Sequence, residues 1–386
     1  MNKPNYKNGS IVNLMASIKK VFGGKSCYEP LKGFDISDIS KNVVLIIIDG
    51  LGYEYLVKNG QNSFLQENLK GKMTSVFPAT TAAAMTSYAT GLAPAEHALT
   101  GWFMFLKEIG MITRILPFNS RAGGFNLGKG HIKFKDIYNA KSFFQGLKAT
   151  SISIKHKNYI DSEYNRLVEK GAKKFSFSNL NDFFKQISKA LKIKNKRKFI
   201  LAYWGKLDTL CHEKGTDSPE AKKHFNLLDK KIKALAESLK HKNITIIISA
   251  DHGLIDTKKK NKIIELKDHP RFMETLALPL SGEPRTAYCY VRPGKVRQFE
   301  NYVKKEFKKC CEMHKSDDLI KENYFGLFKQ NKKLKDRVGD YVLIMKEDYI
   351  MKDLVLGGKR DIKIGNHGGV SDEEMFVPLV VIKQKI

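Results

Sequence analysis

The feature that most constrains the fold of this chain is an uninterrupted apolar run at residues 43–48, which ends in Asp49-Gly50. A run that is apolar on both faces and rich in β-branched residues is typical of a strand buried in a parallel sheet. Similar runs follow at 199–204, 244–248 and 376–382. Helical patterns, including 180–191 and 218–239, lie between them. This alternation predicts an α/β fold with a mostly parallel sheet flanked by helices.

Two long intervals, 101–148 and 256–364, depart from this alternation. The second has a strand–helix–strand pattern of its own, at 287–291, 298–309 and 341–345. Because functional groups of open α/β sheets gather beyond the carboxyl ends of the strands, we expect this interval to form a cap over that edge. The predicted organisation is an N-terminal extension at 1–40, a core at 41–255 and 365–386, and an inserted α+β cap subdomain at 256–364.

The chain is strongly basic, with 68 Lys and Arg residues against 40 Asp and Glu residues and a formal net charge of +28. Such a charge attracts polyanions, which include nucleic acids, anionic membrane surfaces and phosphorylated small molecules. Most of the positive residues are lysines in stretches such as 192–198 and 258–262, which are typical of solvated loops and helix faces. Because no recognition motif accompanies them, the charge alone does not indicate a dedicated nucleic-acid surface.

The cysteines are odd in number and lack the spacing of a disulfide framework or a zinc knuckle. They are Cys27, Cys211, Cys289, Cys310 and Cys311. We expect free thiols in a reducing compartment. The first residues have no apolar core adequate for a signal peptide, and no apolar run reaches membrane-spanning length. These features predict a cytoplasmic protein without a transmembrane segment, and they do not indicate an oligomeric state.

Aspartate and histidine residues lie at or near the ends of the predicted strands. They are Asp49, Asp208, His212, Asp251, His252 and His367. A single Asp-His pair in a polar loop is usually a solvated surface feature, so the argument rests on the joint placement of all six. Mixed oxygen and nitrogen ligands suit zinc, with manganese as the alternative, and six exceed what one tetrahedral ion with an open position uses. The sequence therefore predicts two divalent metal ions.

A threonine pair, Thr80-Thr81, lies at the predicted N-terminus of a helix. Pro78 interrupts the preceding segment, and the alanine-rich run from Ala82 is a good helix former that ends near Gly91. Helix capping is the simplest explanation for a threonine at this position. The same position also offers free N–H groups and the positive end of a helix dipole to a phosphoryl group. A hydroxyl there becomes a nucleophile when a metal lowers its pKa or a base takes its proton.

The order of these motifs resembles the alkaline phosphatase superfamily, and within it the type I phosphodiesterase and nucleotide pyrophosphatase branch. The motifs are the strand ending in Asp49, the segment 77–81 with its following helix, Asp208-x-x-x-His212, Ala250-Asp251-His252-Gly253 and His367-Gly368-Gly369. The resemblance spans residues 43–381, nearly the whole chain. It implies a three-layer α/β sandwich of the alkaline phosphatase type.

The resemblance also implies a role for each matched residue. Thr81 matches the nucleophile of the family and would form a covalent phospho-enzyme or nucleotidyl-enzyme intermediate. One ion would be bound by Asp49, Asp251, His252 and Thr81, and would activate the Thr81 hydroxyl. The other would be bound by Asp208, His212 and His367, and would later activate water. Two such ions stabilise the attacking and leaving oxygens of an in-line displacement.

The function implied is a metal-dependent hydrolase of phosphoric esters or anhydrides. Phosphodiester or pyrophosphate bonds of small nucleotide-like substrates are the leading class, and nucleic acid is a further candidate substrate. The alternatives are a phosphomonoesterase or phosphomutase of the same superfamily, or a nucleic-acid- or nucleotide-binding protein that uses the charge of +28. Affinity for DNA or RNA that falls steeply with salt and survives metal removal would identify the last alternative.

Two further residues are expected at the substrate. Thr80 adjoins the nucleophile, and Arg285 precedes a predicted cap strand from which it could reach a substrate anion. A salt bridge is the alternative for Arg285. Trp102 and Phe103 follow the turn at Gly101, and they either stack on a base or pack in the core.

Overall fold

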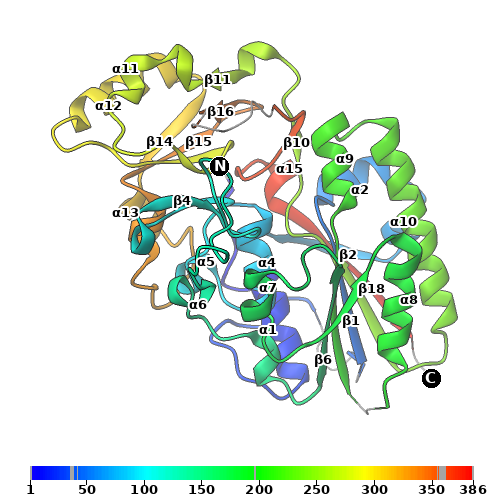
Figure 1. Ribbon diagram of the computed structural model, residues 1–386. Helices are drawn as coiled ribbons and strands as arrows, with labels where there is room; N and C mark the ends of the chain where they lie inside the picture. The colour runs from blue at the N-terminus through cyan, green and yellow to red at the C-terminus, as the bar shows by residue number, and fades with distance from the viewer. Residues whose placement is uncertain are drawn as a thin grey trace.

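The computed structural model describes residues 2–34, 39–40, 42–194, 197–353, 355 and 362–384. A central sheet with helices on both faces forms one part of the molecule, and a second sheet with short helices forms the other (Figure 1). Part of the lysine-rich stretch 192–198, residues 195–196, lies outside the described residues. None of the helices described is long and apolar enough to cross a membrane.

The central sheet has seven strands in the order β2-β18-β9-β1-β8-β6-β7. The five strands from β9 to β7 are parallel, and β18 runs antiparallel between β9 and β2. The predicted apolar runs are β1, β8, β9 and β18, and β9 is buried throughout because helices cover the sheet. The predicted α/β class with a mostly parallel sheet is confirmed. The strands are β1 (Asn42–Ile48), β2 (Leu69–Thr74), β6 (Thr150–His156), β7 (Lys173–Phe177), β8 (Lys198–Trp204), β9 (Ile244–Ser249) and β18 (Phe376–Gln384).

Helices α1, α4 and α7 lie on one side of the central sheet, and α8 and α10 lie on the other (Figure 1). The helices predicted at 180–191 and 218–239 are α8 and α10. α4 is alanine-rich and almost wholly buried, because it packs between the sheet and the neighbouring helices α1 and α7. The helices are α1 (Ile11–Val21), α2 (Tyr53–Asn59), α3 (Phe64–Glu67), α4 (Thr81–Thr90), α5 (Pro94–His97), α6 (Phe134–Ile137), α7 (Glu163–Val168), α8 (Leu180–Leu191), α9 (Lys206–Lys214) and α10 (Pro219–Ser238).

The second sheet has seven strands in the order β14-β15-β13-β12-β3-β4-β5. It draws strands from both intervals that depart from the α/β alternation, and the pair Gly282–Phe103 joins β12 to β3. The predicted helix at 298–309 is α12 (Val296–Tyr302), continued by a π-helical turn at Val303–Phe307. The strands are β3 (Phe103–Leu106), β4 (Met111–Arg114), β5 (Asn119–Ser120), β12 (Ser281–Glu283), β13 (Thr286–Cys289), β14 (Cys311–Lys315) and β15 (Tyr341–Met345).

The interval 256–364 contains further short elements besides the second sheet. The cap boundaries stay a prediction, and residues 354 and 356–361 of that interval lie outside the described part of the chain. Two small sheets pair β10 with β17 and β11 with β16. The elements are β10 (Ile255–Asp256), β11 (Ile263–Glu265), α11 (Pro270–Met273), α13 (Ser316–Lys321), α14 (Leu334–Val338), β16 (Ile350–Lys352), β17 (Gly365–Asn366) and α15 (Asp372–Met375).

The segment 2–34, within the predicted N-terminal extension, packs closely against the rest of the molecule. The buried side chains of α1 belong to the main hydrophobic core. Ser10 forms a bridge with Thr74 at the end of β2. The backbone N–H of Asn2 donates to the carbonyl of Val370 at 3.2 Å. The segment therefore contacts both β2 and the loop that follows His367.

Candidate active site

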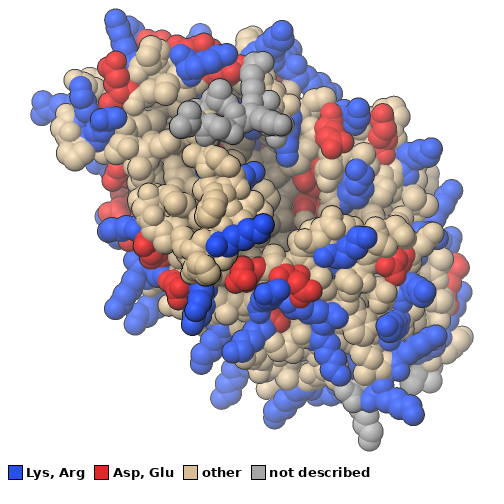
Figure 2. Space-filling model, in the orientation of Figure 1, with Lys and Arg blue, Asp and Glu red and all other residues tan. Residues whose placement is uncertain are grey.

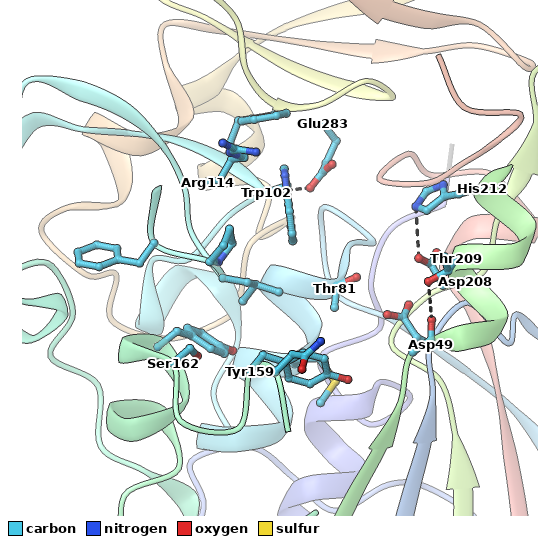
Figure 3. Close-up of a pocket in the computed structure, with 18 of the residues that line it drawn as sticks. Asp49, Thr81, Trp102, Arg114, Tyr159, Ser162, Asp208, Thr209, His212 and Glu283 are labelled. Atoms are coloured by element: carbon cyan, nitrogen blue, oxygen red, sulfur yellow. Dashed lines mark hydrogen bonds and ion pairs between the residues drawn. The ribbon is translucent and has the colours of Figure 1, made fainter. Parts of the chain in front are cut away.

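The Asp, His and Thr residues expected at the site lie together beyond the carboxyl ends of β1, β8 and β9. Asp49 follows β1, Asp251 and His252 follow β9, and Asp208 and His212 occupy one face of α9 directly after β8. His367 follows β17, and Thr81 is the first residue of α4. Figure 3 shows Thr81 approaching from α4 on one side, while Asp49, Asp208 and His212 come from β1 and α9 on the other.

The first half of the cluster consists of Asp49, Asp251 and His252, with the Thr81 hydroxyl beside it. The Thr81 Oγ1 lies 3.1 Å from the His252 Nε2. The same nitrogen lies 3.4 Å from Asp49 Oδ1 and 3.6 Å from Asp251 Oδ2. One ligand atom from each of the three residues lies within 4.8 Å of the others. The His252 Nδ1 faces the Gly253 carbonyl at 3.1 Å, and a hydrogen bond there leaves Nε2 free as a ligand.

The second half contains Asp208, His212 and His367. The His212 Nε2 lies 3.3 Å from Asp208 Oδ2, and the His212 Nδ1 lies 2.6 Å from the Gly365 carbonyl, to which it can donate. The His367 ring stacks on that of His252, with centroids 3.8 Å apart, and lies 5.2 Å from that of His212. One ligand atom from each of Asp208, His252 and His367 lies within 4.8 Å of the others, so His252 borders both halves of the cluster.

Several buried atoms at this site lack a partner, which tests whether the residues suit metal ions. Asp49 Oδ1, Asp208 Oδ1, Asp251 Oδ2 and His367 Nδ1 are buried without a hydrogen-bond partner. Such atoms are costly to bury unless a cation or a proton satisfies them. Carboxylate oxygens and imidazole nitrogens are ligands of zinc and of similar divalent ions. The residues therefore fit the metal ions that the sequence predicts.

Burial and neighbouring charges shift the pKa values of Asp49 and His367 within this cluster. Burial, and then the charges of Asp251 and Asp208, raise the pKa of Asp49 well above its usual range. Burial, and then the neighbouring rings of His252 and His212, lower the pKa of His367 well below its usual range. The His367 imidazole is therefore neutral at ordinary pH, which is the form that binds a metal. Ionisation of the Asp49 carboxyl is therefore favoured by a nearby positive charge.

The structure places Thr80 away from the cavity, in contrast to the expectation that it binds substrate. Thr80 is the N-cap residue of α4 and is fully buried. Its hydroxyl donates to Glu283 Oε1 at 2.6 Å. The hydroxyl is therefore already engaged, whereas the Thr81 side chain is partly exposed and lines the cavity.

Arg285 is also placed away from the substrate, and the expectation that it reaches a substrate anion needs correction. Its guanidinium is buried and pairs with the Glu374 carboxylate, Nη2 to Oε2 at 2.8 Å and Nε to Oε1 at 3.1 Å. Nη1 donates to the Tyr349 carbonyl at 2.6 Å. Salt-bridge formation, the alternative expected from the sequence, satisfies this side chain.

Two further residues touch the site and were not predicted from the sequence. Glu283 lies at the end of β12. Its Oε1 accepts hydrogen bonds from the Thr80 hydroxyl at 2.6 Å and from the backbone N–H of Trp102 at 2.7 Å. Tyr203, near the end of β8, donates its hydroxyl to Asp49 Oδ2. A glutamate in a Gly-Glu-Pro turn carries no sequence signal for this role. A tyrosine near a strand end that faces Asp49 could have been suspected.

A large cavity of about 2190 Å³ opens over the cluster. Asp49, Thr81, Asp208, His212 and His367 line its floor. Its walls carry aromatic and basic side chains from β3, β4 and the loops after β6 and β8. Figure 2 shows the molecule hollowed beside the part that carries the second sheet, and its Lys and Arg side chains are scattered over the visible face and not gathered in one stripe.

Comparisons with known proteins identify the family of this chain and similar folds. A family model described as type I phosphodiesterase / nucleotide pyrophosphatase matches residues 43–369. The structure of murine ectonucleotide pyrophosphatase / phosphodiesterase 5 is similar at 20% identity and a TM-score of 0.64, covering 87% of each chain. The human protein of that name shows 18% identity, the same TM-score of 0.64 and the same 87% coverage. Phosphonoacetate hydrolase from Sinorhizobium meliloti 1021, solved with phosphonoformate, shows 17% identity and a TM-score of 0.63 over 90% of each chain.

Proposed function

This chain belongs to the type I phosphodiesterase / nucleotide pyrophosphatase family of the alkaline phosphatase superfamily, and from that premise we propose that it cleaves nucleotide-like phosphodiesters or pyrophosphates with Thr81 as nucleophile. Membership makes it a metal-dependent hydrolase of phosphoric esters. The proposal adds the nucleophile, a site for two divalent ions, zinc or manganese, and the substrate class.

The observation that carries the proposal is the position of the Thr81 hydroxyl. Its Oγ1 lies 3.1 Å from His252 Nε2, beside the buried and unpaired oxygens of Asp49 and Asp251. A threonine that served only to cap α4 would use its side chain on the backbone of the helix. Thr81 instead points its hydroxyl at the ligand cluster, while Thr80 occupies the N-cap position.

Each group of ligands has a distinct proposed role. Asp49, Asp251 and His252 would hold one ion beside Thr81, and Asp208, His212 and His367 would hold the other. Divalent ions in such a site lower the pKa of a hydroxyl and neutralise charge that develops on phosphoryl oxygens. The N-terminus of α4 directs free N–H groups and partial positive charge toward the same place.

In the first step the Thr81 oxygen forms a bond to phosphorus and its proton passes to solvent, while the bond from phosphorus to the leaving oxygen breaks and that group departs as an anion or takes up a proton from solvent. The residues at the cavity floor would hold the phosphoryl group beside Thr81, and this would orient it before reaction. In the second step water attacks phosphorus and the bond to Thr81 Oγ1 breaks. That step restores the hydroxyl and releases the phosphate product.

The test compares a 4-nitrophenyl ester of thymidine 5′-phosphate with 4-nitrophenyl phosphate, using zinc- or manganese-loaded protein. We expect turnover of the diester that is lost after chelation and in Thr81→Ala, but retained in part by Thr81→Ser, which keeps the hydroxyl. Both variants should unfold at the same temperature as the wild type. Loss of a covalent nucleophile typically reduces kcat by several powers of ten.

The alternatives predict different outcomes of the same test. Preference for the monoester would make the protein a phosphomonoesterase. No turnover of either ester with either metal would contradict the proposed hydrolysis and leave a phosphomutase or a nucleotide-binding protein. On the face that Figure 2 shows, the lysines are scattered and form no stripe that would favour nucleic-acid binding there.

A further inference from the structure

We propose that Arg114 binds a second phosphate group of the substrate, at a point of the cavity separate from the reacting phosphoryl group. The inference rests on the proposed function and deepens it, because it specifies a substrate that carries two separate phosphate groups. It is argued from the size of the cavity, from the missing partner of Arg114 and from the position of β4.

The cavity is larger than one phosphate ester requires. Its volume is about 2190 Å³, whereas ligand sites commonly measure about 300 to 1,000 Å³. It extends from Thr81 and Asp49 at the carboxyl edge of the central sheet to Phe103 and Arg114 on the second sheet. A substrate that fills only the floor would leave the wall formed by β3 and β4 without a contact.

Arg114 is the last residue of β4 and lies opposite Phe103 of β3 in the antiparallel pair. Side chains opposite each other in such a pair lie on the same face of the sheet. Both side chains line the cavity and are partly buried. Figure 3 shows Arg114 and Trp102 above Thr81, with Glu283 beside Trp102.

The Arg114 guanidinium lacks a protein partner among the described residues. Its Nε is buried without a hydrogen bond, and no carboxylate in the described part of the chain forms an ion pair with it. Its Nη2 lies close to the Cα of Gly124, where an added Cβ would approach to 3.0 Å. A partly buried guanidinium without a counter-charge is unfavourable unless a ligand supplies one.

Other arginines near the second sheet are already neutralised, which sets Arg114 apart. Arg121 pairs with Asp353 and lies over the Phe103 ring, 4.5 Å from its centroid. Arg337 pairs with Glu108 at 3.0 Å. Both of these arginines therefore pair with a carboxylate, whereas Arg114 pairs with none among the described residues and lines the cavity.

Arg114 is linked to the nucleophile without belonging to the metal cluster. The Thr80 hydroxyl and the Trp102 N–H meet at one oxygen of Glu283. Phe103, the next residue, lies opposite Arg114. These contacts fix the position of the cavity wall formed by β3 and β4 relative to Thr81. A substrate held by both ends would therefore be oriented for attack.

The planar fork of a guanidinium suits the paired oxygens of a phosphate. The test measures binding of thymidine 5′-phosphate and of thymidine 3′,5′-bisphosphate to metal-loaded Thr81→Ala protein by titration calorimetry. We expect the bisphosphate to bind about tenfold or more tightly than the monophosphate, in line with a hydrogen-bonded charge pair. Arg114→Ala should remove this preference, and Arg114→Lys should retain only part of it.

Lys157→Ala is the matched control, because Lys157 is an exposed cation that lines the same cavity from another element. It should keep the preference for the bisphosphate. Equal affinities for the two nucleotides before substitution, no binding of either, or a preference that survives Arg114→Ala would overturn the proposal. Failure of diester turnover would count against the proposed function alone, since the affinity ratio is measured without catalysis.

Discussion

At the scale of single residues, Glu283 lies outside the ligand cluster but holds the residue next to Thr81 in place. Its carboxylate joins the N-cap of α4 to the turn before β3, and its Cβ lies close to Gly368, where an added Cβ would approach to 2.6 Å. Burial raises the pKa of Glu283 to about 7. Because its folded pKa is raised, the stability that Glu283 contributes is complete below its unfolded value, about 4.3, and is lost as pH rises through about 7.

Two substitutions of Glu283 distinguish the contribution of its hydrogen bonds from that of its charge. Glu283→Ala leaves the Thr80 hydroxyl and the Trp102 N–H unpaired, which should lower the free energy of unfolding by about 2 to 4 kcal/mol and reduce kcat. Glu283→Gln keeps an acceptor oxygen for both donors, so it should retain most of the activity. The free energy of unfolding in denaturant, measured at about pH 6 and at about pH 9, tests the effect of ionising the Glu283 carboxyl.

The loss of stability between these two pH values should be smaller in Glu283→Gln than in the wild type. An equal loss in both proteins would show that Glu283 does not titrate in this range. Equal activity of the alanine and glutamine variants would show that the acceptor oxygen does not position Thr81.

At the scale of elements, the buried pair Arg285–Glu374 connects the turn between β12 and β13 to α15. The Glu374 carboxylate also accepts the Gly369 N–H at 2.8 Å, two residues after His367. The pair therefore holds the loop of His367 against the second sheet. Its role is to fix two elements relative to each other, which explains why Arg285 lies outside the cavity.

Removing one partner of this pair should be costly. Arg285→Met leaves a buried carboxylate without a counter-charge and should lower the free energy of unfolding by about 3 to 5 kcal/mol. Arg285→Met combined with Glu374→Gln removes the charge but keeps the acceptor for Gly369, so it should recover much of that loss. Urea unfolding of the two variants measures the difference. A larger loss in the double variant, or a KM that rises in proportion to the loss of stability, would contradict a purely structural role.

Local patterns predicted four strands of the central sheet, β1, β8, β9 and β18, but not β2, β6 or β7, and they indicated only part of the second sheet. β1, β8 and β9 are largely apolar, and α8 and α10 have a clear helical period, so their ranges follow closely from the sequence. The pair of Phe103 with Gly282 joins distant parts of the chain, and no local pattern specifies it. Five of the six Asp and His ligand candidates could be predicted because they follow β1, β8 and β9, whose carboxyl ends share an edge, whereas His367 follows β17 of a small separate sheet. Partners such as Glu283 for Thr80 depend on tertiary contacts.

At the scale of the whole molecule, metal binding and stability should be linked through pH. Burial and the charges of Asp251 and Asp208 raise the pKa of Asp49, so stability in the metal-free protein falls as pH rises through that raised value. Divalent ions bind the ionised carboxylates and neutral imidazoles, and therefore displace protons.

We expect zinc or manganese to raise the unfolding temperature, and to do so more at about pH 8 than at about pH 6. Thermal unfolding with and without chelator measures both effects. Asp49→Asn should weaken the rise at each pH, because it removes a ligand oxygen charge. A rise that is independent of pH would contradict the assignment of ionised carboxylates as ligands.

The placement of β18 has a consequence for biosynthesis. β18 lies between β9 and β2, although β2 precedes β9 in the chain and β18 follows all the other strands that the structure describes. On the ribosome, β2 therefore has no neighbour in the central sheet until β18 emerges. His367 and the carbonyl of Val370, which receives the Asn2 N–H, are also translated late. The proposed reactive centre is therefore completed only after His367 has been synthesised, long after Asp49 and Thr81.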